Sequence, residues 1–188
     1  MHEQHGESSV RQRLMDSAVL LFTTRGYAAT SVREIVEIAG VTKPALYYHF
    51  DSKDAILRAL VGTMLDQVAE LVEWARAQHL TQELRREVLI RWADVVQAHG
   101  LALCRFAVAN RKVVEGIRPA GEGGAHLLTE LYRVLTPAGA SIEDQLRVRL
   151  ALMSINMAGF TATGIDAADG EILEAARRIS IGLLPQDL

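Results

Sequence analysis

The sequence is poor in cysteine and in long apolar runs, and each shortage excludes a class of protein. Cys104 is the single cysteine among 188 residues, which excludes a disulfide within the chain and is typical of a reducing compartment. No apolar run approaches the length of a transmembrane helix, and the polar start MHEQHGESS lacks the basic residues and apolar core of a secretory signal. With 49% hydrophobic and 23% charged residues, we expect a soluble, globular, cytoplasmic protein that makes no membrane contact.

Positive charge is not in excess either. The formal net charge is −3, and basic and acidic residues are equal in number within residues 1–60. Any contact with nucleic acid must therefore come from individually placed cations and helix dipoles rather than from a broadly positive domain.

Catalytic and metal-binding motifs are missing from the sequence as well. His79, His99 and His126 lack the close spacing of zinc ligands, and neither a nucleophile motif nor a phosphate-binding loop occurs. We therefore expect no catalytic residues, no metal site, no cofactor and no enzyme activity.

What the sequence does contain is helical periodicity. Residues 9–25 carry apolar side chains at the spacing of one buried helix face, and Gly26 follows as a C-terminal stop; these residues are Leu14, Ala18, Leu21 and Phe22. Residues 53–76 carry a longer apolar stripe.

Two short helices are predicted between these longer ones. Ser31 and Glu34 have the spacing of a capping box at the start of the first, and Gly40 ends it. Its buried side is expected to hold Ile35, Ile38 and Ala39. Thr42 can cap the second, in which Pro44 is tolerated because the first turn needs no amide donor. Three helices over residues 9–50, the last two joined by a tight turn, are the arrangement of a helix-turn-helix.

The third helix is unusual because only 5% of the chain is aromatic, yet Tyr47, Tyr48 and Phe50 lie in one turn of it. At about 100° per residue, Leu46 and Phe50 share its inward side, where they anchor a helix too short to be stable alone. The outward side would suit the major groove of DNA. The alternative interpretation is a partly buried hinge between this small unit and the long helix that follows.

The stretch ATSVREIVEIAGVTKPALYYHFDSKDAIL, with LMDSAVLLFTTRGY before it, resembles the N-terminal domain of the tetracycline-repressor (TetR) family of transcriptional regulators. The resemblance stops near residue 68. It implies that residues 43–50 form a recognition helix whose outward residues face DNA, while neighbouring residues lie near the phosphate backbone. The predicted DNA-contacting residues are Ser31, Arg33, Thr42, Lys43, Pro44, Ala45, Tyr47, Tyr48, His49 and Lys53.

Helical patterns continue beyond residue 68, although residues 101–117 alternate enough in their first half to leave a strand as an alternative. We therefore predict an all-α protein of about nine helices. A TetR-type DNA-binding domain would span residues 8–68, with the helix-turn-helix at 31–50. A larger helical domain for effector binding and dimerisation would span residues 69–188.

The last two predicted helices, at about 142–163 and 170–184, are candidates for a dimer interface. The first is apolar on nearly every side from Leu150 to Phe160, so all of its sides must be buried. A second copy of the chain could bury the outer side. The alternative is that both helices complete the core of their own chain. A dimer also suits DNA reading, because two short recognition helices can contact successive major grooves.

An effector pocket is expected between the helices of the larger domain, for an apolar or aromatic small molecule. Its candidate lining residues are Trp92, His99, Phe106, Asn110, Met153, Asn156 and Met157. Each has an ordinary alternative role as core, helix cap or dimer contact, and Cys104 is expected to be a buried, unreactive thiol.

The resulting prediction is a homodimeric transcriptional repressor that binds an inverted-repeat operator in double-stranded DNA and is released by a small molecule. Release would follow a tilt of the helix over residues 53–76. Two alternatives stay open: an activator or architectural DNA-binding protein of the same fold without an effector, and a helical interaction module without DNA binding.

Overall fold

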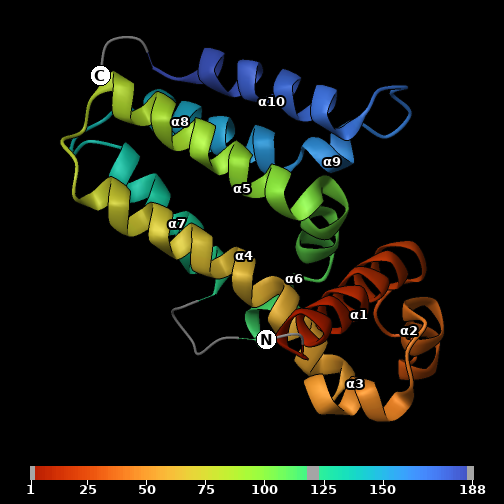
Figure 1. Ribbon diagram of the computed structural model, residues 1–188. Helices are drawn as coiled ribbons and strands as arrows, with labels where there is room; N and C mark the ends of the chain where they lie inside the picture. Colours follow the sequence, from red (N-terminus) through yellow and green to blue (C-terminus); the bar gives the residue numbers. More distant parts are fainter. Residues whose placement is uncertain (1–2, 118–122, 186–188) are drawn as a thin grey trace. The chain divides into compact units, whose positions relative to one another are not determined.

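The computed structural model describes residues 3–117 and 123–185, and within these ranges the chain is helical without strands (Figure 1). The predicted all-helical class is confirmed, and the strand alternative for residues 101–117 is wrong. The elements are α1 (Glu3–Arg25), α2 (Val32–Ala39), α3 (Lys43–His49), α4 (Lys53–Arg76), α5 (Gln82–Ala109), α6 (Arg111–Glu115), α7 (Gly124–Leu135), α8 (Ile142–Asn156), α9 (Ala158–Thr161) and α10 (Asp169–Leu183).

Two predicted helices are divided in the structure. Residues 101–117 contribute the last part of α5 and the short α6, because Asn110 turns its side-chain amide back to the carbonyl oxygen of Phe106 at 2.9 Å and ends α5. Residues 142–163 form α8 and the short α9, which are separated at Met157. The chain divides into two compact units with a boundary between Thr63 and Met64, inside α4.

The N-terminal unit is built around α1, which packs against α2 and α3. The predicted buried face of α1 is confirmed, since none of its four apolar residues is more than 2% exposed. Ile35 and Ala39 of α2 are buried as expected, but the prediction for Ile38 is wrong, because its side chain is 49% exposed. Residues 35 and 39 lie one above the other on the face that meets α1, whereas residue 38 is turned away from that narrow contact.

Arg13 of α1 holds the turn between α2 and α3. Gly40 lies in this turn with φ of 61° and ψ of 39°, a left-handed conformation that glycine adopts without steric cost. The Arg13 guanidinium donates to the carbonyl oxygen of Ala39 and, at 3.0 Å, to that of Gly40. The carbonyl groups at the end of α2 are thereby paired, which fixes the direction in which α3 begins.

In the C-terminal unit, α5, α8 and α10 pack against one another, and α7 packs against α8 (Figure 1). Leu131, Leu135, Val148, Leu152 and Ile155 are fully buried between them. This core also encloses a cation. Arg85 is 0% exposed, its Nε donates to the carbonyl oxygen of Leu135 at 3.0 Å, and desolvation lowers the pKa of its guanidinium. The bond ties the start of α5 to the end of α7.

Substitution of Gly40 by alanine tests the turn. We expect Gly40→Ala to lower the free energy of unfolding of the N-terminal unit by about 1–2 kcal/mol, because alanine is strained at positive φ. A Cβ at this position would also lie 3.0 Å from Nη2 of Arg13. Urea unfolding followed by circular dichroism measures the change.

Gly62→Ala is the matched control, since Gly62 lies within α4 and a Cβ there meets no atom within 4 Å. Alanine in a helix interior is expected to stabilise the unit by roughly 0.5–1 kcal/mol. Equal effects of the two substitutions would contradict the role assigned to the turn.

Candidate nucleic-acid interface and ligand pocket

The start of α2 is held by the predicted capping box. Oγ of Ser31 accepts from the amide of Glu34 at 3.2 Å, and the Glu34 carboxylate accepts from the amide of Ser31 at 2.8 Å. Arg25 pairs with the same carboxylate at 2.7 Å. The hydrogen bond from the Ser31 backbone is the main reason that the pKa of Glu34 is lowered. Ser31 and Arg33 are both exposed at this end of α2, where the first helical amides favour anions.

The two faces of α3 are as predicted. Leu46 is 0% and Phe50 5% exposed, whereas Tyr47 is 46% and Tyr48 71% exposed. Thr42 caps the helix by accepting from the amide of Ala45 at 3.3 Å. The remaining predicted residues divide by exposure: Thr42, Lys43 and Pro44 are exposed, and Ala45 and His49 are half-buried.

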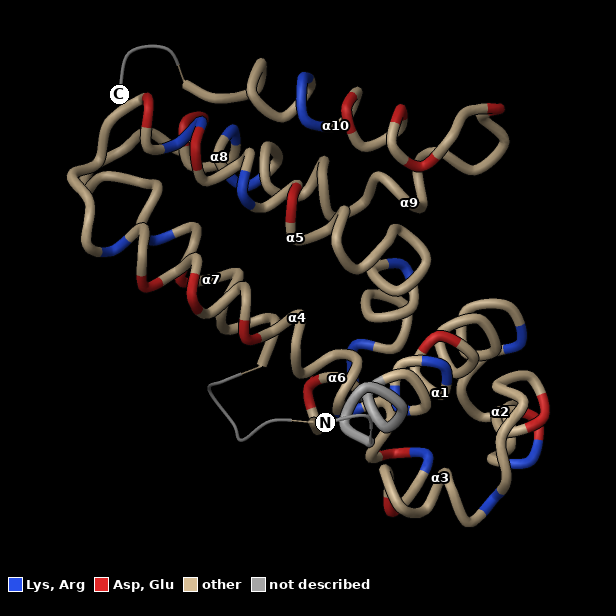
Figure 2. Tube along the Cα trace, in the orientation of Figure 1, with Lys and Arg blue, Asp and Glu red and all other residues tan. Residues whose placement is uncertain are grey.

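Aromatic contacts on α3 organise its outward surface. The Lys43 ammonium lies 6.0 Å from the centre of the Tyr47 ring, and the Tyr48 and His49 rings meet edge to face at 5.0 Å. The α3 surface therefore combines one placed cation with aromatic rings that carry polar atoms. Arg33 lies beside Glu34 and Glu37 in α2, and α3 carries Lys43 without an acidic residue, so positive charge is not concentrated along these two helices (Figure 2).

Lys53 contacts the loop between α1 and α2, which is distant in the sequence. Its ammonium donates to the carbonyl oxygens of Tyr27 and Thr30, both at 2.8 Å, and lies 4.3 Å from the centre of the Tyr27 ring. Tyr27 in turn donates its hydroxyl proton to the carboxylate of Asp54. Lys53 thus fixes the loop between α1 and α2, and with it the start of α2. Its predicted contribution to DNA binding would act through this loop.

Arg11 of α1 contacts the end of α3, which sequence reasoning missed. Its guanidinium lies 5.2 Å from the centre of the Phe50 ring, at the end of α3. Together with Arg13, it makes α1 a source of cations that position α3. Nothing in the spacing of either arginine marks this role, because both contacts join α1 to distant parts of the chain.

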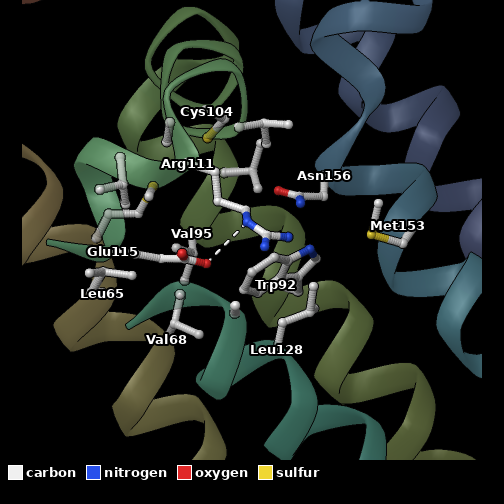
Figure 3. Close-up of a pocket in the computed structure, with 17 residues that line it drawn as sticks. Leu65, Val68, Trp92, Val95, Cys104, Arg111, Glu115, Leu128, Met153 and Asn156 are labelled. Atoms are coloured by element: carbon white, nitrogen blue, oxygen red, sulfur yellow. Dashed lines mark ion pairs between the residues drawn. The ribbon is translucent and has the colours of Figure 1, made fainter. Parts of the chain in front are cut away.

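A cavity of about 280 Å³ opens between helices of the C-terminal unit (Figure 3). Its lining is largely apolar and comes from α4, α5, α6, α7 and α8, with Leu65, Val68, Val95, Val96, Cys104, Val108, Val114 and Leu128 among the lining residues. Three of the seven candidates from the sequence line it: Trp92, Met153 and Asn156.

The other four candidates lie outside this cavity, and the break in α5 explains part of the difference. Gly100 has φ of 78° and ψ of 147°, so the two parts of α5 do not share one helical face. His99 lies before this break, on the same part of α5 as Trp92 but about two turns further along, and its Nε2 lies 3.0 Å from Oε1 of Gln67. Phe106 is buried elsewhere, Asn110 caps α5, and Met157 ends α8.

Polar groups in the cavity are few and distinctive. Trp92 is 7% exposed, and its indole Nε1 is a buried donor without a hydrogen-bond partner in the described part of the chain. Leaving such a donor unpaired costs about 1–3 kcal/mol. Arg111 lines the cavity with its side chain 73% exposed, and its Nε pairs with the Glu115 carboxylate at 3.1 Å (Figure 3). Sequence reasoning missed Arg111 and Glu115, since their spacing is that of an ordinary surface ion pair.

Cys104 lines the cavity as an uncharged thiol. Its side chain is 4% exposed, and burial raises the pKa of the thiol to about 11. The thiolate is therefore scarce at neutral pH, in keeping with the expected unreactive cysteine. In the described ranges, no group of His, Cys, Asp and Glu side chains is arranged to hold a metal ion. The same ranges contain no helix with the length and apolar character needed to span a bilayer.

Comparison with known proteins agrees with this geometry. Residues 14–60 match the family described as bacterial regulatory proteins, tetR family. Residues 14–60 are therefore a domain of the tetR family. The transcriptional repressor KstR2 of Rhodococcus jostii is 42% identical over 71 residues, which are 36% of this chain and 35% of that protein. The matched segments span 35% to 48% of the first three relatives, whose names are all those of helix-turn-helix regulators.

Solved structures extend the likeness of fold to most of the chain. AmtR of Mycobacterium smegmatis is 24% identical, with a TM-score of 0.71 over 90% of this chain and 85% of AmtR. FadR of Bacillus subtilis, in complex with stearoyl-CoA, is 18% identical, with a TM-score of 0.62 over 94% of this chain and 98% of FadR. Both similarities concern the fold alone.

Burial of His99 predicts a pH dependence of stability. Desolvation lowers the pKa of its imidazole, so the unfolded chain binds a proton more readily than the folded chain does. The stability contributed by neutral His99 is complete above the unfolded pKa of about 6.5 and is lost as the pH falls from there toward the folded pKa.

We expect His99→Gln to lose less stability than the wild type between about pH 7.5 and pH 5. Urea unfolding at the two pH values measures this difference. His79→Gln, at an exposed histidine, is the control and should behave as the wild type does. A loss in His99→Gln as large as in the wild type would contradict the assignment.

Proposed function

We propose that this protein is a homodimeric repressor that binds an inverted-repeat DNA site and is released by a small molecule. The observation that carries the proposal is the arrangement of α3, the capped second helix of the helix-turn-helix. Its inward residues Leu46 and Phe50 are buried, and Lys43, Tyr47 and Tyr48 are exposed. The match of residues 14–60 to the tetR family supports it.

The DNA contact would combine one cation with aromatic side chains on α3. Lys43 is exposed in the first turn, where a recognition helix meets base edges and phosphates. Tyr48 and His49 lie one turn further on and would face the bases. Since the chain carries a net charge of −3, phosphate contacts would depend on individually placed cations rather than on a broadly positive surface.

The second copy would pack on the outer surface of α8 and α10. These two helices pack against each other, and large apolar side chains remain on their outside: Leu146 is 52%, Leu150 55% and Ile179 59% exposed. Removing such side chains from water stabilises association by about 25 cal/mol per Å². An isologous contact of this kind would place two α3 helices on one DNA duplex.

The effector would act through α4. This helix begins at Lys53, which fixes the α1–α2 loop, and it supplies Met64, Leu65 and Val68 to the cavity. A ligand that favours one position of α4 over another would shift the population of DNA-binding dimers. A structural relative, FadR of Bacillus subtilis, has been solved with stearoyl-CoA, which supports a ligand in a protein of this fold.

The DNA-binding part is tested by selecting duplexes from a random library and then measuring affinity by fluorescence anisotropy at several salt concentrations. We expect an enriched inverted repeat. Tyr48→Ala should weaken binding by roughly tenfold or more, because its ring would no longer meet the bases. Lys43→Gln should weaken binding and also reduce its salt dependence, by about 0.9 in the logarithmic slope for each phosphate that the protein no longer neutralises.

Arg86→Gln, at an exposed arginine of α5, is the matched charge control and should leave affinity and slope unchanged. Circular dichroism of each variant checks folding. Failure to enrich any sequence, with or without candidate ligands, would favour the interaction-module alternative. Enrichment of a single half-site would count against the dimer.

Association is tested separately with Leu150→Glu. A charge on the outer surface of α8 should be costly to bury, so we expect the wild type to be a dimer and this variant a monomer in sedimentation at micromolar concentration. Ile165→Glu is the control, because Ile165 is 61% exposed but lies between α9 and α10. A monomeric wild type would contradict the proposal.

A further inference from the structure

The buried indole of Trp92 is the most informative group in the cavity. It combines near-complete burial with a donor that has no partner in the described residues, and it lies among apolar side chains. Buried donors in folded proteins are nearly always paired with protein, water or ligand. An acceptor brought by a bound molecule would satisfy Nε1 without any change in the protein.

Other polar groups converge on the same part of the cavity. Figure 3 shows the Arg111 side chain extending between Glu115 on one side and Asn156 and the Trp92 indole on the other. Glu115 pairs with Nε of Arg111 at 3.1 Å. A guanidinium carries further N–H groups in a planar fork that matches two carboxylate oxygens. The charges of Arg111 and Glu115 offset each other, so the donors that remain for a ligand are the Trp92 indole N–H and the outer guanidinium N–H groups, which favours a ligand head with acceptors.

The remaining lining sets the character and size of the rest of the ligand. It consists mainly of aliphatic side chains, with the uncharged Cys104 and the flexible Met64 and Met153, which adapt to different shapes. An apolar cavity of about 150 Å³ holds one benzene molecule. A cavity of 280 Å³ therefore has room for roughly ten to twelve non-hydrogen atoms.

We propose that the ligand is a small monocarboxylate with an apolar body, whose carboxylate accepts hydrogen bonds from Trp92 Nε1 and from the Arg111 guanidinium. The apolar body lies among the aliphatic residues of α4, α5 and α7. This inference rests on the proposed function in taking the cavity as the effector site, and it specifies the chemical class of effector.

Octanoate, with about ten non-hydrogen atoms, is a suitable probe for a cavity of this size. Calorimetric titration of the full chain should detect binding of octanoate and at least roughly tenfold weaker binding of methyl octanoate, which keeps the carbonyl acceptor but lacks the charge. Trp92→Phe keeps the ring and removes the donor, and Arg111→Gln removes the fork. Each should weaken octanoate binding by about tenfold.

Lys112→Gln is the matched control. Lys112 is an exposed cation of the same short helix, α6, but does not line the cavity, so its replacement should change the affinity by less than about twofold. Thermal unfolding of each variant identifies any loss of folding.

Fluorescence locates the bound molecule, because the chain has two tryptophans, Trp74 and Trp92. In Trp74→Phe, octanoate should shift the emission of the remaining Trp92. In Trp92→Phe, the emission of Trp74 should not respond. A response of Trp74 alone would place the ligand elsewhere and overturn the proposal.

Two outcomes of calorimetry overturn the ligand class: no octanoate binding at millimolar concentration, or equal affinity for octanoate and its methyl ester. Anisotropy with the selected duplex separates this inference from the proposed function. Specific DNA binding without octanoate binding would support the proposed DNA-binding function and exclude a monocarboxylate as the ligand. Octanoate binding at Trp92 without release of DNA would support the carboxylate-binding site but exclude the carboxylate as the effector.

Discussion

A helix of seven residues is marginal in water, and the proposed DNA-binding surface of this protein depends on how that weakness is overcome. α3 is held because Leu46 and Phe50 are buried, which stabilises it by roughly 1.5–3 kcal/mol for each side chain. Arg13 secures the turn before it, and Arg11 lies over the Phe50 ring at its end. With its inward side occupied in this way, α3 can leave Tyr48 exposed without losing its shape.

The N-terminal unit uses its cations mainly for its own construction. Arg13 and Lys53 both donate to backbone carbonyl oxygens, and Arg25 pairs with the carboxylate that caps α2. These contacts explain how a unit without excess positive charge can present a defined surface to an anionic partner. The proposed recognition of DNA therefore depends on side chains whose positions are fixed by hydrogen bonds, and not on a large positive electrostatic potential.

The C-terminal unit shows the opposite balance, with a tightly packed core beside an incompletely filled cavity. Around Arg85 and Leu135 the polar and apolar groups are buried and paired. Around Trp92 a donor lies unpaired among apolar side chains, within the described part of the molecule. Interiors are ordinarily packed as densely as organic crystals, so a cavity of 280 Å³ with such a donor is typical of a binding site rather than of a core.

Features that depend on neighbours along one helix are predictable from the sequence alone. The capping box at Ser31, the Gly40 turn and the inward side of α3 follow from spacings of three or four residues, and all are confirmed. The tertiary structure decided the rest. Ile38 is exposed because α2 meets α1 over a narrow contact, and Lys53 bonds a loop more than twenty residues away. The cavity was only partly predictable for the same physical reason, since its lining is assembled from five helices and the bend at Gly100 changes which side chains of α5 face it. Arg111 looks like any solvated ion pair until packing places it beside an apolar cavity.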